Sequence, residues 1–246
     1  MTVRIPRIYT AQPLRGNAVV VLEPDPSRHL SLVLRLGVGE RVTLFDGRGG
    51  EYPGEITAVD KKNVHVMTGS HLPRECESPL NIHLGIAVSR GERMDWIVQK
   101  ATELGVSSIT PLWTEHTGVK LTSARTDKKM QHWQQIAISA CEQCGRNRPP
   151  TVHALLALAH WLESTVAERR YVLHHRADAI EAAGGPPASI ALLVGPEGGL
   201  SEGEIEAAEQ AGFTSLRLGP RVLRTETAPL AAIAILQSHW GDMRPG

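Results

Sequence analysis

The chain of 246 residues lacks several features that would place it in a membrane or in a secreted disulfide scaffold. Its longest apolar run, Ala228–Leu236, is far shorter than a membrane span and contains a proline. Three cysteines, an odd number, argue against a disulfide framework. Aromatic residues make up only 4% of the chain, so any stacking on nucleic-acid bases is expected to be limited. The first residues carry arginines and a proline where a secretion signal needs an apolar stretch, which favours a cytoplasmic protein.

Charge gives no overall sign of a nucleic-acid partner, because 26 basic and 26 acidic side chains leave a net charge of zero. The charges are unevenly spread. Residues 120–148 hold six Lys and Arg, whereas residues 181–212 hold six Glu and neither Lys nor Arg. A local basic face can still attract phosphate. Charge alone favours the plainer interpretation, two solvated helix faces of opposite sign.

The part of the chain before residue 73 is dominated by short strand-like runs separated by turns. One helical stretch, Ser27–Leu36, interrupts them. Several short strands within about 70 residues predict a small β-barrel or sandwich. Two prolines among polar residues then indicate a linker over Leu72–Pro79. The expected strands are Ala18–Leu22, Arg41–Asp46, Glu55–Val59 and Val64–Met67.

After the linker the pattern changes to alternating strands and helices, which predicts an α/β domain with a mostly parallel sheet. We therefore divide the chain into domains at 1–72 and 73–246. Ser201 and Glu204 have the spacing of a capping box at a helix start. Strands are expected at 80–88, 108–113, 170–174, 190–194 and 214–218, and helices at 92–104, 123–144, 155–167, from 202 to Gly212, and up to Trp240.

Two glycine- and proline-containing loops near the C-terminus are the most informative segments. They are Gly195–Gly199 and Gly219–Thr227, and each follows an expected strand and precedes an expected helix. Glycine lets a flat ligand approach the backbone closely, and ligands of open α/β sheets bind where strands end. The two loops therefore predict one ligand held mainly by main chain.

The same loops exclude common phosphate-binding sites. Neither a P-loop nor a dinucleotide fingerprint occurs in the chain. The first loop contains Glu197 and no lysine, and further glutamates follow it. An acidic loop suits an uncharged or cationic ligand, such as a nucleoside with a sulfonium centre and an amino-acid tail. Cys141 and Cys144 lack a second ligand pair, so we expect a structural role for them and no metal site.

Five segments together resemble the ribosomal RNA small-subunit methyltransferase E family, one of the SPOUT (trefoil-knotted) methyltransferases. The last two segments are the most specific. The segments are Arg4–Tyr9, Arg93–Gly105, Glu142–Arg146, Leu193–Gly199 and Leu218–Ala228.

The resemblance implies a SPOUT trefoil-knot domain preceded by a small PUA-like β-barrel that grips RNA. It implies a homodimer whose active sites draw on both subunits. The implied reaction is methylation of N3 of one uridine in the decoding region of 16S rRNA, on the small ribosomal subunit, with S-adenosylmethionine as methyl donor. The residues expected to hold this cofactor are Leu173, His174, Gly195, Pro196, Glu197, Gly199, Leu218, Gly219, Pro220, Val222 and Leu223.

Four residues are candidates for the chemistry. The uracil N3 must lose its proton, and a nearby cation would stabilise the anion that forms. Arg224 and Arg146 are the candidate cations. Glu226 is the first candidate proton acceptor, and Glu142 of the partner subunit is the second. Structural alternatives remain open, since Glu226 fits the first turn of a helix and Arg146 fits a helix C-terminus.

The candidate RNA contacts are basic residues from both domains: Arg4, Arg7, Arg28, Lys128 and Lys129. Two other classes of function compete with a methyltransferase. One is an RNA-binding protein that has kept the knot but lost turnover. The other is a nucleotide-binding enzyme of another class, such as a phosphotransferase, which the missing P-loop disfavours.

Overall fold

The computed structural model describes residues 5–118, 123–175 and 185–243, and the chain divides into two compact units. The first unit comprises Met1–Glu77 and Cys141–Pro149. The second comprises Ser78–Ala140 and Pro150–Gly246. The first crossing between them falls inside the 72–79 segment. Residues 141–149 return to the first unit after a long stretch of the second.

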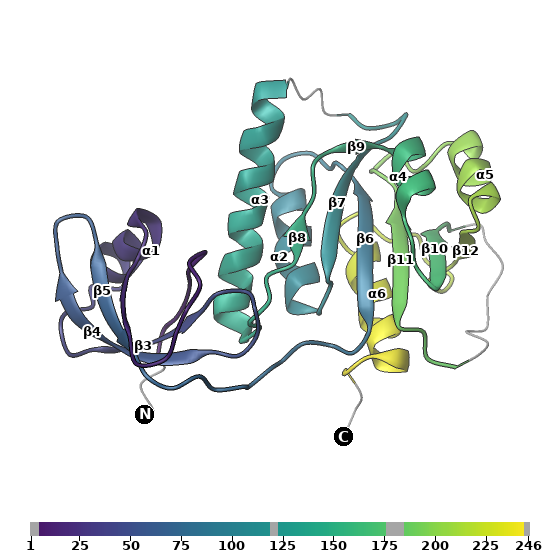
Figure 1. The fold of residues 1–246 in the computed structure, drawn as a ribbon. Helices are drawn as coiled ribbons and strands as arrows, with labels where there is room; N and C mark the ends of the chain where they lie inside the picture. The colour runs from purple at the N-terminus through teal and green to yellow at the C-terminus, as the bar shows by residue number, and fades with distance from the viewer. Residues whose placement is uncertain (1–4, 119–122, 176–184, 244–246) are drawn as a thin grey trace. The chain divides into compact units, whose positions relative to one another are not determined.

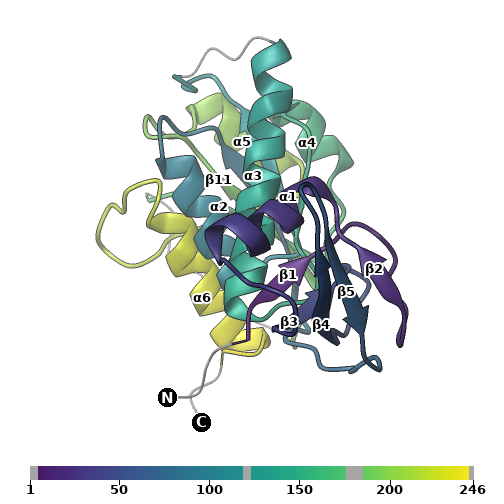
Figure 2. The same ribbon diagram turned by 90° about the vertical axis from the view of Figure 1, so that its left-hand side faces the viewer.

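A five-stranded sheet forms the first unit, in the order β1-β3-β4-β5-β2 (Figure 2). β1 pairs with β3 in parallel, and the other pairs are antiparallel. The four expected strands are present, whereas β1 was not predicted. Alternate residues such as Val42 and Leu44, or Val64 and Val66, face a common core. The bounds are β1 Arg7–Tyr9, β2 Val19–Val21, β3 Arg41–Phe45, β4 Tyr52–Val59 and β5 Val64–Thr68.

The helical segment of this unit differs from the expected Ser27–Leu36. It begins earlier, as α1 over Pro24–Arg28, and widens into a π-helical turn, η1, over His29–Val33. Proline at the helix start is tolerated because the first turn needs no N–H from it. The Leu34 N–H donates to the His29 carbonyl at 2.9 Å, a five-residue step. The hydrophobic pattern located this helical segment but could not reveal its change of pitch.

In the part of the second unit that the structure describes, seven strands form one sheet and all their pairs are parallel. Figure 1 shows this sheet with its helices. The strand order is β12-β10-β11-β6-β7-β8, and β9 also pairs with β7. The predicted mostly parallel sheet is confirmed. The bounds are β6 Asn81–Ala87, β7 Ser108–Trp113, β8 Thr151–Val152, β9 Leu156–Ala157, β10 Arg169–Leu173, β11 Ser189–Val194 and β12 Thr214–Leu216.

Helices cover both faces of this sheet, and the central strands are therefore buried on both sides. In β11, Ile190 and Leu192 pack with residues of α2, α3 and α6, while Ala191 and Leu193 pack with residues of α4 and α5. The expected helix 155–167 is shorter than predicted, because β9 takes its first residues. The bounds are α2 Arg93–Glu103, α3 Ser123–Cys144, α4 Leu158–Ser164, α5 Glu202–Gln210 and α6 Ala228–Trp240.

A buried amide on α6 satisfies backbone groups at the end of α2. Gln237 is fully buried, and its Nε2 donates to the carbonyl of Leu104 at 3.1 Å. Its Oε1 accepts from the Ser78 hydroxyl at 2.6 Å. Gly105, with φ of +88°, ends the α2 turn beside this amide. The Gln237 side chain therefore joins α6 to the α2–β7 turn.

Replacing Gln237 by Met should keep the volume but leave the Leu104 carbonyl and the Ser78 hydroxyl without this partner. We expect the free energy of unfolding to fall by about 1–3 kcal/mol in urea titrations. Gln210→Met, at an exposed position of α5, is the matched control and should change stability by less than about 0.5 kcal/mol. Equal effects of the two substitutions would contradict this role.

Candidate functional site

A cavity of about 880 Å³ lies at the carboxyl ends of three adjacent strands of the second unit, β12, β10 and β11. Its walls come from the residues that directly follow these strands, together with α5 and the start of α2 and α6. This is the position at which open parallel sheets bind ligands. Both glycine- and proline-containing loops contribute, so the structure brings them to one cavity as predicted.

Most of the expected cofactor-binding residues line this cavity. They are Leu173, His174, Gly195, Pro196, Glu197, Gly199, Leu218, Val222 and Leu223. The two candidates for the chemistry in the second loop, Arg224 and Glu226, line it too. Gly219 and Pro220 are not among the lining residues. Gly219 has φ of +73° and so turns the second loop, and contact of Gly219 and Pro220 with the cofactor stays a prediction.

Sequence reasoning missed several lining residues. Glu202, Glu206 and Glu209 face the cavity from α5, and their spacing of four and three residues is the available signal. Arg217, just after β12, and Arg221, in the second loop, also line the cavity. The capping box of Ser201 and Glu204 is confirmed at the start of α5. The cavity therefore has an acidic wall on α5 and a basic wall on the second loop.

Arg93, the first residue of α2, connects the two loops through their carboxylates. Its Nη1 donates to Glu197 Oε1 at 2.7 Å, and its Nε lies 3.9 Å from Glu226 Oε2. The Arg90 backbone N–H also donates to Glu197, at 3.2 Å. Burial alone would raise the pKa of Glu197, but these hydrogen bonds and the charge of Arg93 outweigh burial and lower it. Glu197 therefore stays ionised, but the charge of Arg93 offsets its negative charge, so the negative wall of the cavity comes mainly from α5.

The glycines of the first loop are required by close packing within the protein. A Cβ atom at Gly195 would lie 3.0 Å from both the Cγ and the backbone N of Leu200. A Cβ at Gly198 would lie 3.1 Å from the Cβ of His116, whose Nδ1 is 3.1 Å from the Gly199 carbonyl oxygen. Gly199 itself has φ of +75°. The loop is therefore held in one narrow turn, and its backbone forms a fixed wall of the cavity.

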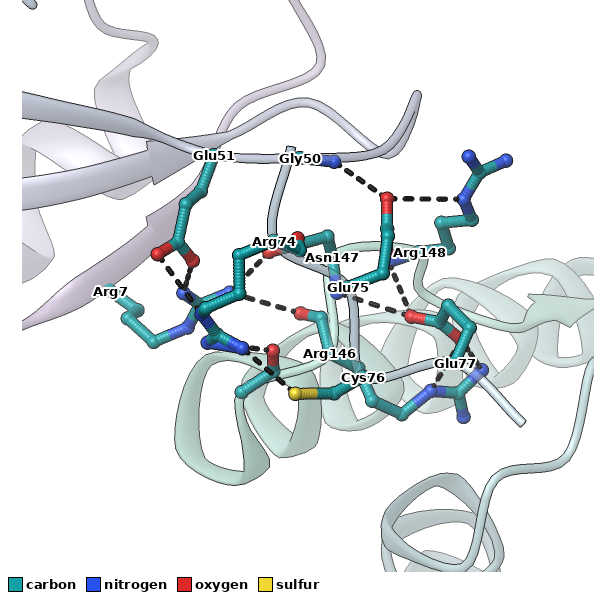
Figure 3. Close-up of polar contacts among 11 residues, drawn as sticks. Arg7, Gly50, Glu51, Arg74, Glu75, Cys76, Glu77, Arg146, Asn147 and Arg148 are labelled. Carbon is teal, nitrogen blue, oxygen red and sulfur yellow. Dashed lines mark hydrogen bonds and ion pairs between the residues drawn. The ribbon is translucent and has the colours of Figure 1, made fainter. Parts of the chain in front are cut away.

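The other two candidates for the chemistry, Glu142 and Arg146, belong to the first unit. Arg146 is 5% exposed, and its Nε and Nη2 donate to Glu77 Oε2 at 2.9 and 2.7 Å (Figure 3). The other oxygen of Glu77 accepts from the N–H groups of Asn147 and Arg148. These contacts fix the loop after α3. A catalytic role for Arg146 stays a prediction.

Arg7 lies in the same polar network. Its guanidinium pairs with Glu51 and donates to Asn147 Oδ1 at 2.6 Å, and only 11% of its side chain is exposed (Figure 3). The guanidinium carbon also lies 4.9 Å from the centre of the Phe45 ring. Arg74 joins the network by donating to Glu51 and to the Gly145 carbonyl. These contacts give Arg7 a structural role, and its contact with RNA stays a prediction.

The remaining RNA-contact candidates have different surroundings. Arg28 is exposed at the end of α1 and pairs with Asp25 at 3.2 Å. Lys128 is exposed on α3, while the Nζ of Lys129 lies 5.5 Å from the centre of the Trp133 ring. Arg4 lies outside the described residues. Arg28 and Lys128 are thus the two candidates that the structure leaves exposed at the surface of their units.

Among residues 5–118, 123–175 and 185–243, no three His, Cys, Asp or Glu side chains gather closely enough to hold a metal ion. Over the same ranges, no helix is both long and apolar enough to cross a membrane.

The Cys141 thiol is buried, and a hydrogen bond with Cys144 together with this burial raises its pKa.

Family models match both parts of the chain. A model described as an RNA methyltransferase domain matches residues 76–237, and one described as an RNA methyltransferase PUA domain matches residues 22–66. The ribosomal RNA small subunit methyltransferase E of Buchnera aphidicola subsp. Schizaphis graminum is 35% identical over 245 residues, which cover 99% of this chain and 100% of that relative.

Solved structures agree with these matches. A methyltransferase from Legionella pneumophila in complex with the cofactor SAM has a TM-score of 0.94 and 42% identity, and the match covers 98% of this chain and 100% of that chain. The ribosomal RNA small subunit methyltransferase E from Neisseria gonorrhoeae bound to S-adenosyl methionine has a TM-score of 0.92 and 40% identity, over 97% of this chain and 99% of that chain. The predicted fold class, a PUA-like sheet domain before an α/β methyltransferase domain, is confirmed.

The pH dependence of stability tests the environment of Glu142. Burial raises its pKa above 4.5, and the Tyr9 N–H, His29 and Arg7 offset this only in part. A carboxyl whose pKa is higher in the folded state stabilises the fold while it is protonated, and this contribution is lost as pH rises through the folded pKa. Glu142→Gln keeps an acceptor for Tyr9 but cannot ionise.

We therefore expect Glu142→Gln to match the original protein in acid and to become the more stable of the two as the pH rises well above 4.5. Urea unfolding over this pH range measures the difference. Glu55→Gln, at an exposed position of β4, controls for the loss of one surface charge. Parallel pH profiles for the original protein and Glu142→Gln would show that burial does not act on this carboxyl.

Proposed function

Because the chain belongs to the ribosomal RNA small subunit methyltransferase E family, we propose that it methylates N3 of one uridine in the decoding region of 16S rRNA. The methyl donor is S-adenosylmethionine. The observation that carries this proposal is the cavity at the ends of β10, β11 and β12, whose walls are the two loops that resemble the family's motifs. Two structural neighbours are described as bound to the same cofactor.

The cavity fits S-adenosylmethionine in size and in chemistry. Its volume of about 880 Å³ is within the range of ligand sites. Leu173, Leu218 and Leu223 offer apolar surface for an adenine ring, and the acidic face of α5 suits a sulfonium and an ammonium group. The arginines of the second loop suit a carboxylate. When bound, the cofactor supplies an electrophilic methyl group, and no metal is needed.

The second loop provides the side chains that act on the uracil, which is the methyl acceptor. Glu226 lines the cavity with about a quarter of its side chain exposed, at 26%, so a carboxylate is available to take the N3 proton. Arg224 lines the cavity from the same loop and supplies a cation for the uracil oxygen that gains negative charge. In this proposal the first loop positions the cofactor and the second loop also acts on the uridine.

The rest of the family architecture belongs to the proposal too. The first unit grips the rRNA of the small subunit through exposed cations such as Arg28. Two chains form a homodimer, in which Glu142 reaches the active site of the partner as the second candidate proton acceptor, and Arg146 is the second candidate cation. The loops that wall the cavity form the trefoil knot. A protein that acts on ribosomal subunits works in the cytoplasm.

The test is methyl transfer from labelled S-adenosylmethionine to small subunits that lack this methylation, followed by identification of the nucleoside. We expect 3-methyluridine at one position. Glu226→Gln should lower kcat by about a hundredfold or more and leave cofactor affinity nearly unchanged, because the general base acts only in the chemical step. Glu163→Gln, at an exposed position of α4, is the matched control.

Three outcomes would contradict the proposal. A different modified nucleoside would overturn the N3 assignment. Binding of cofactor and RNA by the original protein without transfer would indicate an RNA-binding protein that has lost turnover. Full activity of Glu226→Gln would remove Glu226 as the proton acceptor.

The backbone wall of the cofactor site is tested at Gly195. An added Cβ would press on Leu200 at 3.0 Å and displace the loop. We expect Gly195→Ala to weaken S-adenosylmethionine binding by about tenfold or more in calorimetry, equal to about 1.4 kcal/mol. Gly203→Ala is the control, since an added Cβ there meets nothing within 4 Å and helix α5 favours alanine. Unchanged affinity of Gly195→Ala would refute a rigid backbone wall.

A further inference from the structure

Arg93 occupies an electrostatically unfavourable position for a basic residue. It is the first residue of α2, and the N-terminus of a helix favours negative charge. The helix dipole therefore gives no reason for a cation at this position. A residue that breaks a local rule points to a role set by tertiary contacts.

Those contacts join two segments that are far apart in the sequence. The Arg93 guanidinium binds Glu197 of the first loop at 2.7 Å and lies 3.9 Å from Glu226, just before α6. Arg93 and Glu197 are separated by 104 residues. All three side chains are partly exposed, at 42%, 32% and 26%, and all three line the cavity.

Without Arg93 the two loops would present like charges to each other. Both carboxylates lie within 4 Å of one guanidinium, so they share a small volume of the cavity wall. Like charges at this range repel and favour separation of the groups that carry them. The guanidinium reverses the sign of this interaction, because its planar group can bind two carboxylates at once.

We propose that Arg93 is a positioning residue that holds the two cofactor loops at their binding distance through Glu197 and Glu226. This inference rests on the proposed function, because it concerns the same cavity. We call the three-residue contact the Arg93 bridge. It sets the spacing of the cavity walls before the cofactor arrives, so the free energy for ordering the loops is not taken from binding. It also fixes the Glu226 carboxylate on the wall where the uridine is expected.

The Arg90 side chain provides a matched control for the bridge. Arg90 is exposed and lies three residues before Arg93, but only its backbone N–H contacts Glu197. Arg90→Gln therefore removes one nearby positive charge and leaves the bridge intact. Arg93→Gln removes the same charge and breaks it.

The first measurement is S-adenosylmethionine affinity by calorimetry, without RNA. We expect Arg93→Gln to weaken binding about tenfold, as for the loss of a charged hydrogen bond, and Arg90→Gln to stay within about twofold. Glu197→Gln should weaken binding by a similar factor. The double variant Arg93→Gln/Glu197→Gln should be no weaker than the worse single variant, because both changes break one contact.

The second measurement is amide hydrogen exchange of the protein without cofactor. Arg93→Gln should speed exchange in both loops, 195–199 and 219–227, while exchange in α4 stays unchanged. Arg93→Lys keeps the charge but lacks the planar group, so it should restore part of the affinity. If Arg93→Gln folds poorly, comparing the affinity of Arg93→Lys with that of the original protein still tests the bridge.

Each contrary result has a distinct meaning. Equal affinities of Arg93→Gln and Arg90→Gln, or losses that multiply in the double variant, would overturn the bridge. A raised KM for RNA with unchanged cofactor affinity would show that Arg93 binds the substrate instead, and would also overturn it. If the original protein does not bind S-adenosylmethionine, the proposed function fails and the inference fails with it. If the original protein binds and only the variants disagree, the inference fails alone.

Discussion

Parallel pairing of the seven strands in the second unit constrains where this protein can bind a ligand. Each parallel connection needs a crossover, and the helices of these crossovers cover both faces of the sheet. The faces are therefore closed, and the loops at the strand ends carry the exposed backbone. Because the carboxyl ends of β12, β10 and β11 are adjacent, the loops that follow them meet in one cavity. The position of the site is thus a consequence of strand pairing, and the loop residues determine its chemistry.

Local patterns in the sequence predicted most elements and both loops of the site. Glycine and proline after an apolar run mark a strand end, and this signal depends only on neighbouring residues. The sequence did not predict which side chains of α5 would line the cavity. Which face of α5 meets the cavity depends on Ile205 and Ala208 packing beneath it, and that packing involves residues from other elements. Strand β1 was missed because Arg7–Tyr9 begins with an arginine and lacks the continuous run of valines that marks the equally short β2.

The charge partners of three candidate residues could not be predicted from the sequence. Glu197 looked free to meet a cationic ligand, and Arg7 and Arg146 looked free to meet RNA or the uridine. In the fold, each has an opposite charge from a distant segment. Arg7 meets Glu51 across 44 residues, and Arg146 meets Glu77 across 69. A one-dimensional pattern cannot reveal such partners. The exposed arginines that line the cavity, including Arg224, and the glutamates of α5 are charged groups that the structure places at the cavity itself.

The return of residues 141–149 to the first unit has a consequence for synthesis on the ribosome. Residues up to Glu77 leave the exit tunnel before residues 141–149, but the carboxylate of Glu77 has its partners on Arg146, Asn147 and Arg148. About 70 further residues must be translated before that network can close, which takes several seconds at ordinary elongation rates. The nascent first unit therefore lacks this network while β6, α2, β7 and most of α3 emerge. The order of translation and the order of domain completion differ in this chain.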